Sequence, residues 1–114
     1  MLEIVVVLFA LAALIGIILA GLHLKKRGAP IPLALLHGVV AAVGLVLLIV
    51  AVTQMASAGL AGVALVIFVI AALGGLVLFT MHLKQKALPG PLIVVHGLVA
   101  VAAFIVLLLA LSRG

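Results

Sequence analysis

Four histidines are the side chains of this chain whose type and spacing fit them for chemistry. They occur in two copies of one pattern, "HLKKRGAPIPLALLHG" from His23 to Gly38 and "HLKQKALPGPLIVVHG" from His82 to Gly97. A neutral imidazole is a common metal ligand, and it titrates close to neutral pH. The pattern therefore points to metal binding, cofactor binding or proton transfer.

The two copies are separated by a constant 59 positions, which pairs His23 with His82 and His37 with His96. Two apolar helices can agree by composition alone, but agreement at His, Pro and Lys goes further. We therefore predict a tandem duplication of a helical hairpin, with repeat 1 at 1–55 and repeat 2 at 60–114. Each copy has an even number of spans, which gives parallel repeats about an axis along the membrane normal. Equivalent residues should then face each other at one depth.

The composition places the chain in a lipid bilayer. Hydrophobic residues make up 71% of the 114 positions, and a soluble domain of this size could not bury so much apolar surface. A membrane-spanning helix needs about 20 apolar residues, and four such runs occur at 2–22, 31–53, 59–81 and 90–111. We predict an all-α membrane protein, a four-transmembrane-helix bundle that forms one domain over 1–114. Because cysteine is absent, disulfides and thiolate sites are excluded.

The charged residues predict an orientation. Five of the six cations lie in the connections 24–30 and 83–89, and the net charge is +5. The positive-inside rule places these connections in the cytoplasm and both termini outside, and we expect a bacterial inner membrane. Cations at the ends of apolar spans suit lipid headgroups and give no indication of nucleic-acid binding.

Prolines fix the depth of the histidines. A Pro-x-Pro pair starts the second helix of each copy, where a missing N–H costs little. His37 and His96 should lie about 7–8 Å deeper than these prolines, with His23 and His82 nearer the surface on the same side. Ionisable residues in spans are costly and default to a functional hypothesis. The structural alternative is a neutral histidine that bonds to a carbonyl and holds two helices together.

Small residues accompany each histidine at a spacing of seven. Residues two helical turns apart share a face, so each small residue should leave room on its histidine's face, toward the membrane centre. A flat macrocycle held by a histidine needs such room, whereas close helix packing is the alternative use of small residues. The pairs are Gly16 with His23, Gly75 with His82, Gly44 with His37, and Ala103 with His96.

Four spans, paired histidines, basic connections and nearby glycines together resemble small membrane b-type cytochromes, such as the superoxide-oxidase and b561-like groups. The resemblance covers helix number, histidine content and the association of histidine with glycine. It includes no diagnostic motif, and the quinone-site residues of those families have no recognisable counterpart here. Di-haem members place one haem near each membrane face, whereas all four histidines here fall on one side, so the resemblance implies one haem.

The resemblance implies haem b held by two axial histidines from different helices. We assign these to His37 and His96, with His23 and His82 as groups around them or as ligands of another site. Bis-histidine ligation leaves no open iron position, which favours electron transfer, with a quinone or another redox partner, over oxygen chemistry. Four cations are placed to meet haem propionates or, as the alternative, anionic lipids: Lys25, Arg27, Lys84 and Lys86.

Three other functions remain open. Four imidazoles around one axis could bind zinc or copper. Titrating histidines could line a path for protons or a small solute, although the membrane carboxylate of the small multidrug transporters has no equivalent here. The chain could also be a non-catalytic accessory or assembly subunit of a larger membrane complex, or a homo-oligomer packed through its Gly and Ala surfaces. A hydrolytic site is disfavoured because Ser57 and Ser112 have no histidine near them at their membrane depth.

Overall fold

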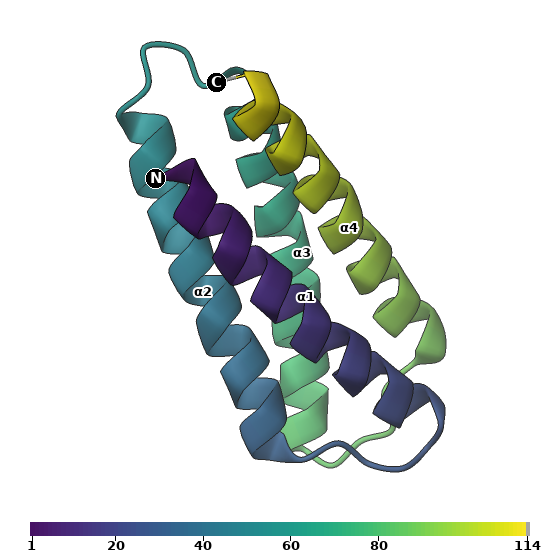
Figure 1. The fold of residues 1–114 in the computed structure, drawn as a ribbon. Coiled ribbons are helices and arrows are strands. Elements are labelled where there is room, and N and C mark those ends of the chain that lie inside the picture. The colour runs from purple at the N-terminus through teal and green to yellow at the C-terminus, as the bar shows by residue number, and fades with distance from the viewer. Residues whose placement is uncertain (114) are drawn as a thin grey trace.

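The computed structural model describes residues 1–113, which form four α-helices in an antiparallel bundle (Figure 1). The helices are α1 (Leu2–Leu24), α2 (Ile31–Thr53), α3 (Gly59–Leu83) and α4 (Gly90–Arg113). All four are long and apolar enough to cross a membrane, so the predicted fold class is confirmed. Three helices run two residues further than predicted. Gly114, the last residue of the predicted domain and of repeat 2, lies outside the described residues.

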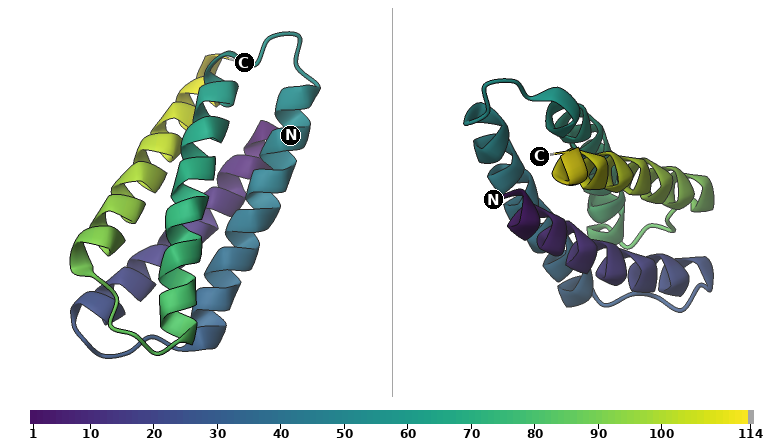
Figure 2. Two further views of the ribbon diagram at one scale, coloured as in Figure 1. Left: turned by 180° about the vertical axis from the view of Figure 1, so that it is seen from behind. Right: turned by 45° about the horizontal axis from the view of Figure 1, so that its top comes forward.

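The two basic loops lie at one end of the bundle. The uncharged loop at 54–58, between α2 and α3, and both ends of the described chain lie at the other end (Figures 1 and 2). The closest packing is within each hairpin, α1 against α2 and α3 against α4, and the two hairpins pack less closely against each other. The hairpin is therefore the tighter unit of the fold. Only toward the basic end do its helices diverge, where α1 and α4 separate from α2 and α3 in both Figure 1 and Figure 2.

Helices α1 and α3 end in the same way, 59 residues apart. Lys26 and Gln85 have φ angles of 56° and 57°, in the left-handed region that disfavours residues with a Cβ. The chain reverses there, and the amides of Arg27 and Lys86 donate to carbonyl oxygens of the last helical turn at 2.9 and 3.0 Å. This bond closes the helix end, as in a Schellman motif. Pro30 then precedes α2, as the Pro-x-Pro pattern predicted.

Glycine is expected to stabilise both of these turns. A residue with a Cβ in the left-handed region costs about 1–2 kcal/mol, whereas glycine adopts it freely and loses about 0.5–1 kcal/mol in backbone entropy. Lys26→Gly and Gln85→Gly should therefore each raise the free energy of unfolding by about 0.5–1 kcal/mol. Thermal unfolding of the detergent-solubilised variants measures the change. A lowered Tm in either variant would contradict the shared turn geometry.

Two phenylalanine rings form the centre of the core. Phe9 of α1 and Phe68 of α3 stack with their centroids 3.8 Å apart and their planes at 7°. A Cβ at Gly44 would lie 3.3 Å from the Phe9 ring, so the glycine brings α2 close to it. Fully buried aliphatic residues pack around the stack: Val5, Leu48, Ala64, Ala103 and Leu107. The bundle axis is thus closed by the stack, on the far side of the histidines from the basic loops.

Equivalent residues of the two hairpins meet in space. The pairs Phe9–Phe68, His23–His82 and His37–His96 are each 59 positions apart, and each is a pair of neighbouring rings. The sequence predicted that equivalent residues face each other across a common axis. These contacts support the duplication of the hairpin, which itself stays a prediction.

The outer surface of the bundle is apolar. Large aliphatic side chains are exposed along all four helices, with Ile17 and Leu98 at 68% and 64%. No buried polar or charged residue occurs among residues 1–113. Such a surface matches lipid tails and not water, so the protein is an integral membrane protein.

Candidate functional site: two histidine pairs in the bundle

The deeper histidine pair joins the second helices of the two hairpins. His37 lies on α2 and His96 on α4, each about two turns inside its helix. Their ring centroids are 6.4 Å apart, and their planes are nearly perpendicular at 86°. Both residues are half-buried. The structure therefore brings together the two residues that were assigned as axial ligands.

Backbone hydrogen bonds orient both rings of this pair. Nδ1 of His37 donates to the carbonyl oxygen of Ala12 at 2.7 Å, and Nδ1 of His96 donates to that of Ala71 at 2.9 Å. A carbonyl oxygen only accepts, so each Nδ1 carries the proton in this arrangement. The lone pair of each neutral ring then lies on Nε2, the nitrogen available to a metal. An N–H bond from the opposite nitrogen is also what orients a ligating histidine.

Two glycines make space for these rings. A Cβ at Gly16 would lie 2.9 Å from Cε1 of His37, and a Cβ at Gly75 would lie 3.0 Å from Cε1 of His96. Each imidazole therefore rests against a glycine of the first helix of its own hairpin. Any larger residue would push the ring away from its carbonyl partner.

The small residues leave less free room than the sequence predicted. Gly16 and Gly75 were expected to open space beside His23 and His82, but the rings of His37 and His96 take that space. Gly44 was expected to open space beside His37, but the ring of Phe9 fills it. Spacing along one helix identifies a face and not the neighbour that packs on it. For this reason, the sequence did not predict that the rings of His37, His96 and Phe9 occupy the space beside these glycines.

The shallower pair, His23 on α1 and His82 on α3, lies near the basic end. The ring centroids are 4.9 Å apart, with planes at 86°. Nε2 of His82 donates to the carbonyl oxygen of Ala29 at 2.8 Å, and Ala29 is buried in the first loop. This bond ties α3 to the first loop. No signal in the sequence pointed to Ala29, because its contribution is a main-chain carbonyl.

The four imidazoles form two separate layers. Along α1, buried Leu19 lies between Gly16, which contacts the deeper pair, and His23 of the shallower pair. Leu78 is its buried equivalent on α3. Within residues 1–113, no three His, Cys, Asp or Glu side chains form a group that could hold a metal ion. Each layer therefore offers two imidazole donors.

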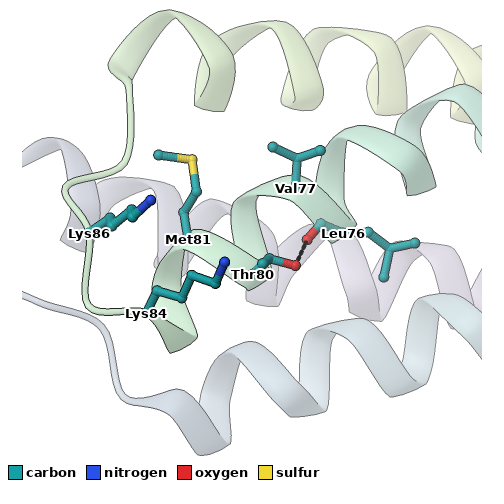
Figure 3. Close-up of a pocket in the computed structure, with 6 residues that line it drawn as sticks. All are labelled: Leu76, Val77, Thr80, Met81, Lys84 and Lys86. Atoms are coloured by element: carbon teal, nitrogen blue, oxygen red, sulfur yellow. Dashed lines mark hydrogen bonds between the residues drawn. The ribbon is translucent and has the colours of Figure 1, made fainter.

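The basic side chains lie at the rim, and all of them are exposed: Lys25, Lys26, Arg27, Lys84 and Lys86. Lys84 and Lys86 line an outer groove on α3 (Figure 3). Their contact with haem propionates stays a prediction, as does that of Lys25 and Arg27.

The arrangement has a defined chemical capacity. Two neutral imidazoles, held by carbonyls on opposite sides of the axis, present two lone pairs within one layer of a low-dielectric bundle. They can bind the two axial positions of one metal centre or exchange a proton.

No known protein family, curated protein or solved structure matches this chain.

Proposed function

We propose that the chain binds one haem b through His37 and His96 and transfers electrons within the membrane. The observation that carries the proposal is a pair of neighbouring, nearly perpendicular imidazoles, each held by a bond from Nδ1 to a carbonyl. A metal–imidazole bond is about 2.0–2.1 Å long. Two rings bound on opposite sides of one ion then have centres about 6 Å apart, close to the 6.4 Å found here.

Two donors favour haem over a bare ion. A structural zinc ion takes four protein ligands, and a catalytic one takes three. Haem brings four nitrogen ligands of its own, so the protein has to supply only the axial pair. The deeper pair supplies that number, from two helices and at a suitable separation. Zinc or copper bound by histidines remains the second candidate, and the test below separates the two.

The number and separation of the imidazole donors suit haem, but the macrocycle fits between the helices only if they move. The Phe9–Phe68 stack closes the axis on one side of the pair, and buried Leu19 and Leu78 lie on the other. A macrocycle has to displace some of these side chains. The hairpins pack less closely against each other than the helices do within each hairpin. We therefore expect the hairpins to move against each other on uptake, with each hairpin intact and with His37 and His96 keeping the separation and ring angle found here.

The residues of the chain have distinct roles in this proposal. When bound, the haem supplies a one-electron iron couple whose potential depends on its axial ligands and surroundings. His37 and His96 would hold the haem, and two protein ligands would leave no position open for oxygen chemistry, which favours electron transfer. The Nδ1–H bonds to Ala12 and Ala71 hold the rings in place and raise their basicity. A quinone or a protein of the same membrane is the proposed redox partner.

The finer localisation is also a proposal. Lys and Arg gathered at one end of the bundle support a cytoplasmic position for both basic loops and an external position for both termini. The membrane is proposed to be a bacterial inner membrane. A C-terminal alkaline phosphatase fusion should be active, because this enzyme is active only outside the cytoplasm. An inactive phosphatase fusion, together with a C-terminal fluorescent-protein fusion that fluoresces, would show the opposite orientation.

An optical spectrum tests the function. Protein purified from haem-supplied cells is expected to be red, with a Soret band that sharpens and an α band that appears when dithionite is added. Pyridine haemochrome analysis should give one haem b per chain. Colourless protein with stoichiometric zinc or copper would replace haem with the metal site. Colourless, metal-free protein that co-purifies with a larger complex would indicate the accessory role.

A further inference from the structure

A shallow groove lies on the outer face of α3, close to the basic end of the bundle. It holds about 280 Å³ and is lined by Leu76, Val77, Thr80, Met81, Lys84 and Lys86 (Figure 3). The groove faces the surroundings of the protein and not the bundle axis, since Leu76 and Val77 are 62% and 52% exposed. It therefore lies outside the histidine layers. A lipid bound there would take up Lys84 and Lys86 as the anionic-lipid alternative to their predicted contact with haem propionates.

Two ammonium groups, those of Lys84 and Lys86, form the end of the groove nearest the basic loops. Lys84 caps α3, and Lys86 follows after Gln85, whose φ of 57° turns the chain back. In Figure 3 the side chain of Lys86 points toward Met81, and that of Lys84 runs along α3 toward Thr80. The only acidic side chain of the sequence, Glu3, is bonded to the N-terminal amine in α1 at 3.2 Å. The two lysines thus have no carboxylate side chain near them and present their charge to an external anion.

The other end of the groove, toward the middle of the membrane, is apolar. Leu76 lies eight residues before Lys84 on α3, which is about 12 Å along the helix toward the middle of the membrane. Thr80 lies between them and donates its hydroxyl proton to the carbonyl oxygen of Leu76 at 2.8 Å. The hydroxyl oxygen can therefore only accept a further bond. A ligand that matches the groove is anionic at one end and a hydrocarbon chain at the other.

We propose that this groove is a binding site for one anionic phospholipid. Its phosphate lies between Lys84 and Lys86, and one acyl chain lies along Leu76 and Val77. The charge, the apolar wall and the position at the end of a membrane span are those of a lipid at the headgroup boundary. Basic pockets on this side of membrane proteins bind anionic headgroups in the same way.

The first hairpin contains a matched control for this site. The equivalent positions, 59 residues earlier, carry the same number of cations in Lys25 and Arg27 and an apolar wall in Ile17 and Ile18. They differ where Gly21 replaces Thr80, Leu22 replaces Met81, and a third cation, Lys26, replaces Gln85. A general attraction of basic loops to lipid would act equally at both places. A built site in the second hairpin would not.

Native mass spectrometry with phosphatidylglycerol and phosphatidylcholine tests the proposal. The double variant Lys84→Gln/Lys86→Gln should retain about tenfold less phosphatidylglycerol than the unmodified protein, because each lysine near the surface contributes to anion binding. The triple variant Lys25→Gln/Lys26→Gln/Arg27→Gln, which removes every cation of the first loop, should change retention less than about twofold. Equal losses in the two variants, or equal retention of phosphatidylcholine by the unmodified protein, would overturn the site.

A second pair of variants separates the groove from its charge. Met81→Trp keeps both lysines but fills the groove, and it should reduce phosphatidylglycerol retention by about tenfold as well. Leu22→Trp makes the same change at the equivalent position of the first hairpin and should leave retention unchanged. Retention that survives Met81→Trp would show that the groove plays no part and would overturn the proposal.

Discussion

Alanine in place of His96 is expected to abolish stable haem binding. The substitution removes one of two axial donors and leaves His37 alone on the other side of the axis. Haem content should fall from one per chain to a small fraction of that. Any haem that remains should be five-coordinate and high-spin, because only one protein ligand is left. Pyridine haemochrome content and the position of the Soret band measure both effects. His37→Ala should behave in the same way.

His23→Ala and His82→Ala are the matched controls for the ligand assignment. Each removes an imidazole of the other pair, with Leu19 or Leu78 between it and the deeper layer. Both variants should keep the haem and its low-spin spectrum. His82→Ala should also lose some thermal stability, because its bond to Ala29 ties α3 to the first loop. Loss of haem in His23→Ala with retention in His96→Ala would place the ligands in the shallower pair.

Leucine in place of Gly16 is expected to weaken haem binding by about 10–100-fold, the usual cost of disturbing a group that orients a metal ligand. A Cβ at this position would lie 2.9 Å from Cε1 of His37, and the rest of a leucine side chain takes more of that space. The ring has to move, and its bond to Ala12 at 2.7 Å is then lost. Haem titration of the apoprotein, followed by Soret absorbance, measures the affinity.

Gly21 provides the control on the same helix. It lies five residues after Gly16, and nothing lies within 4 Å of a Cβ built there. Gly21→Leu should therefore keep the affinity of the unmodified protein, although it places the same new side chain on α1. Gly75→Leu should repeat the effect of Gly16→Leu through His96, where the Cβ distance is 3.0 Å. Equal affinities for Gly16→Leu and Gly21→Leu would contradict the role of the glycine.

The sequence predicted the helices well because their ends carry strong local signals. Prolines and charged residues interrupt apolar runs that are otherwise unbroken, and each observed helix begins at the predicted residue. Helices α1 and α3 extend two residues further because the turns that contain His23 and His82 stay helical before the chain reverses, and α4 continues two residues further, to Arg113. Local chemistry settles such boundaries, whereas packing adds little to them.

The histidine pairs were predicted from the repeat, and their surroundings were not. A constant spacing of 59 residues led us to expect that His37 meets His96 across an axis, and their ring centroids lie 6.4 Å apart. The hydrogen-bond acceptors of these histidines were not predictable, because Ala12 and Ala71 contribute only carbonyl oxygens. The stack of Phe9 on Phe68 was likewise missed, although the two residues are equivalent in the repeat. Contacts between helices depend on helix rotation and crossing, which the spacing within one helix does not specify.

Low-temperature electron paramagnetic resonance of the oxidised, haem-loaded protein shows whether His37 and His96 bind one iron on opposite sides. Their planes lie at 86°, so the account predicts one low-spin ferric signal of the highly anisotropic type that nearly perpendicular imidazoles produce. This signal should disappear in His96→Ala. A high-spin signal in the unmodified protein, or a low-spin signal that survives His96→Ala, would contradict the account.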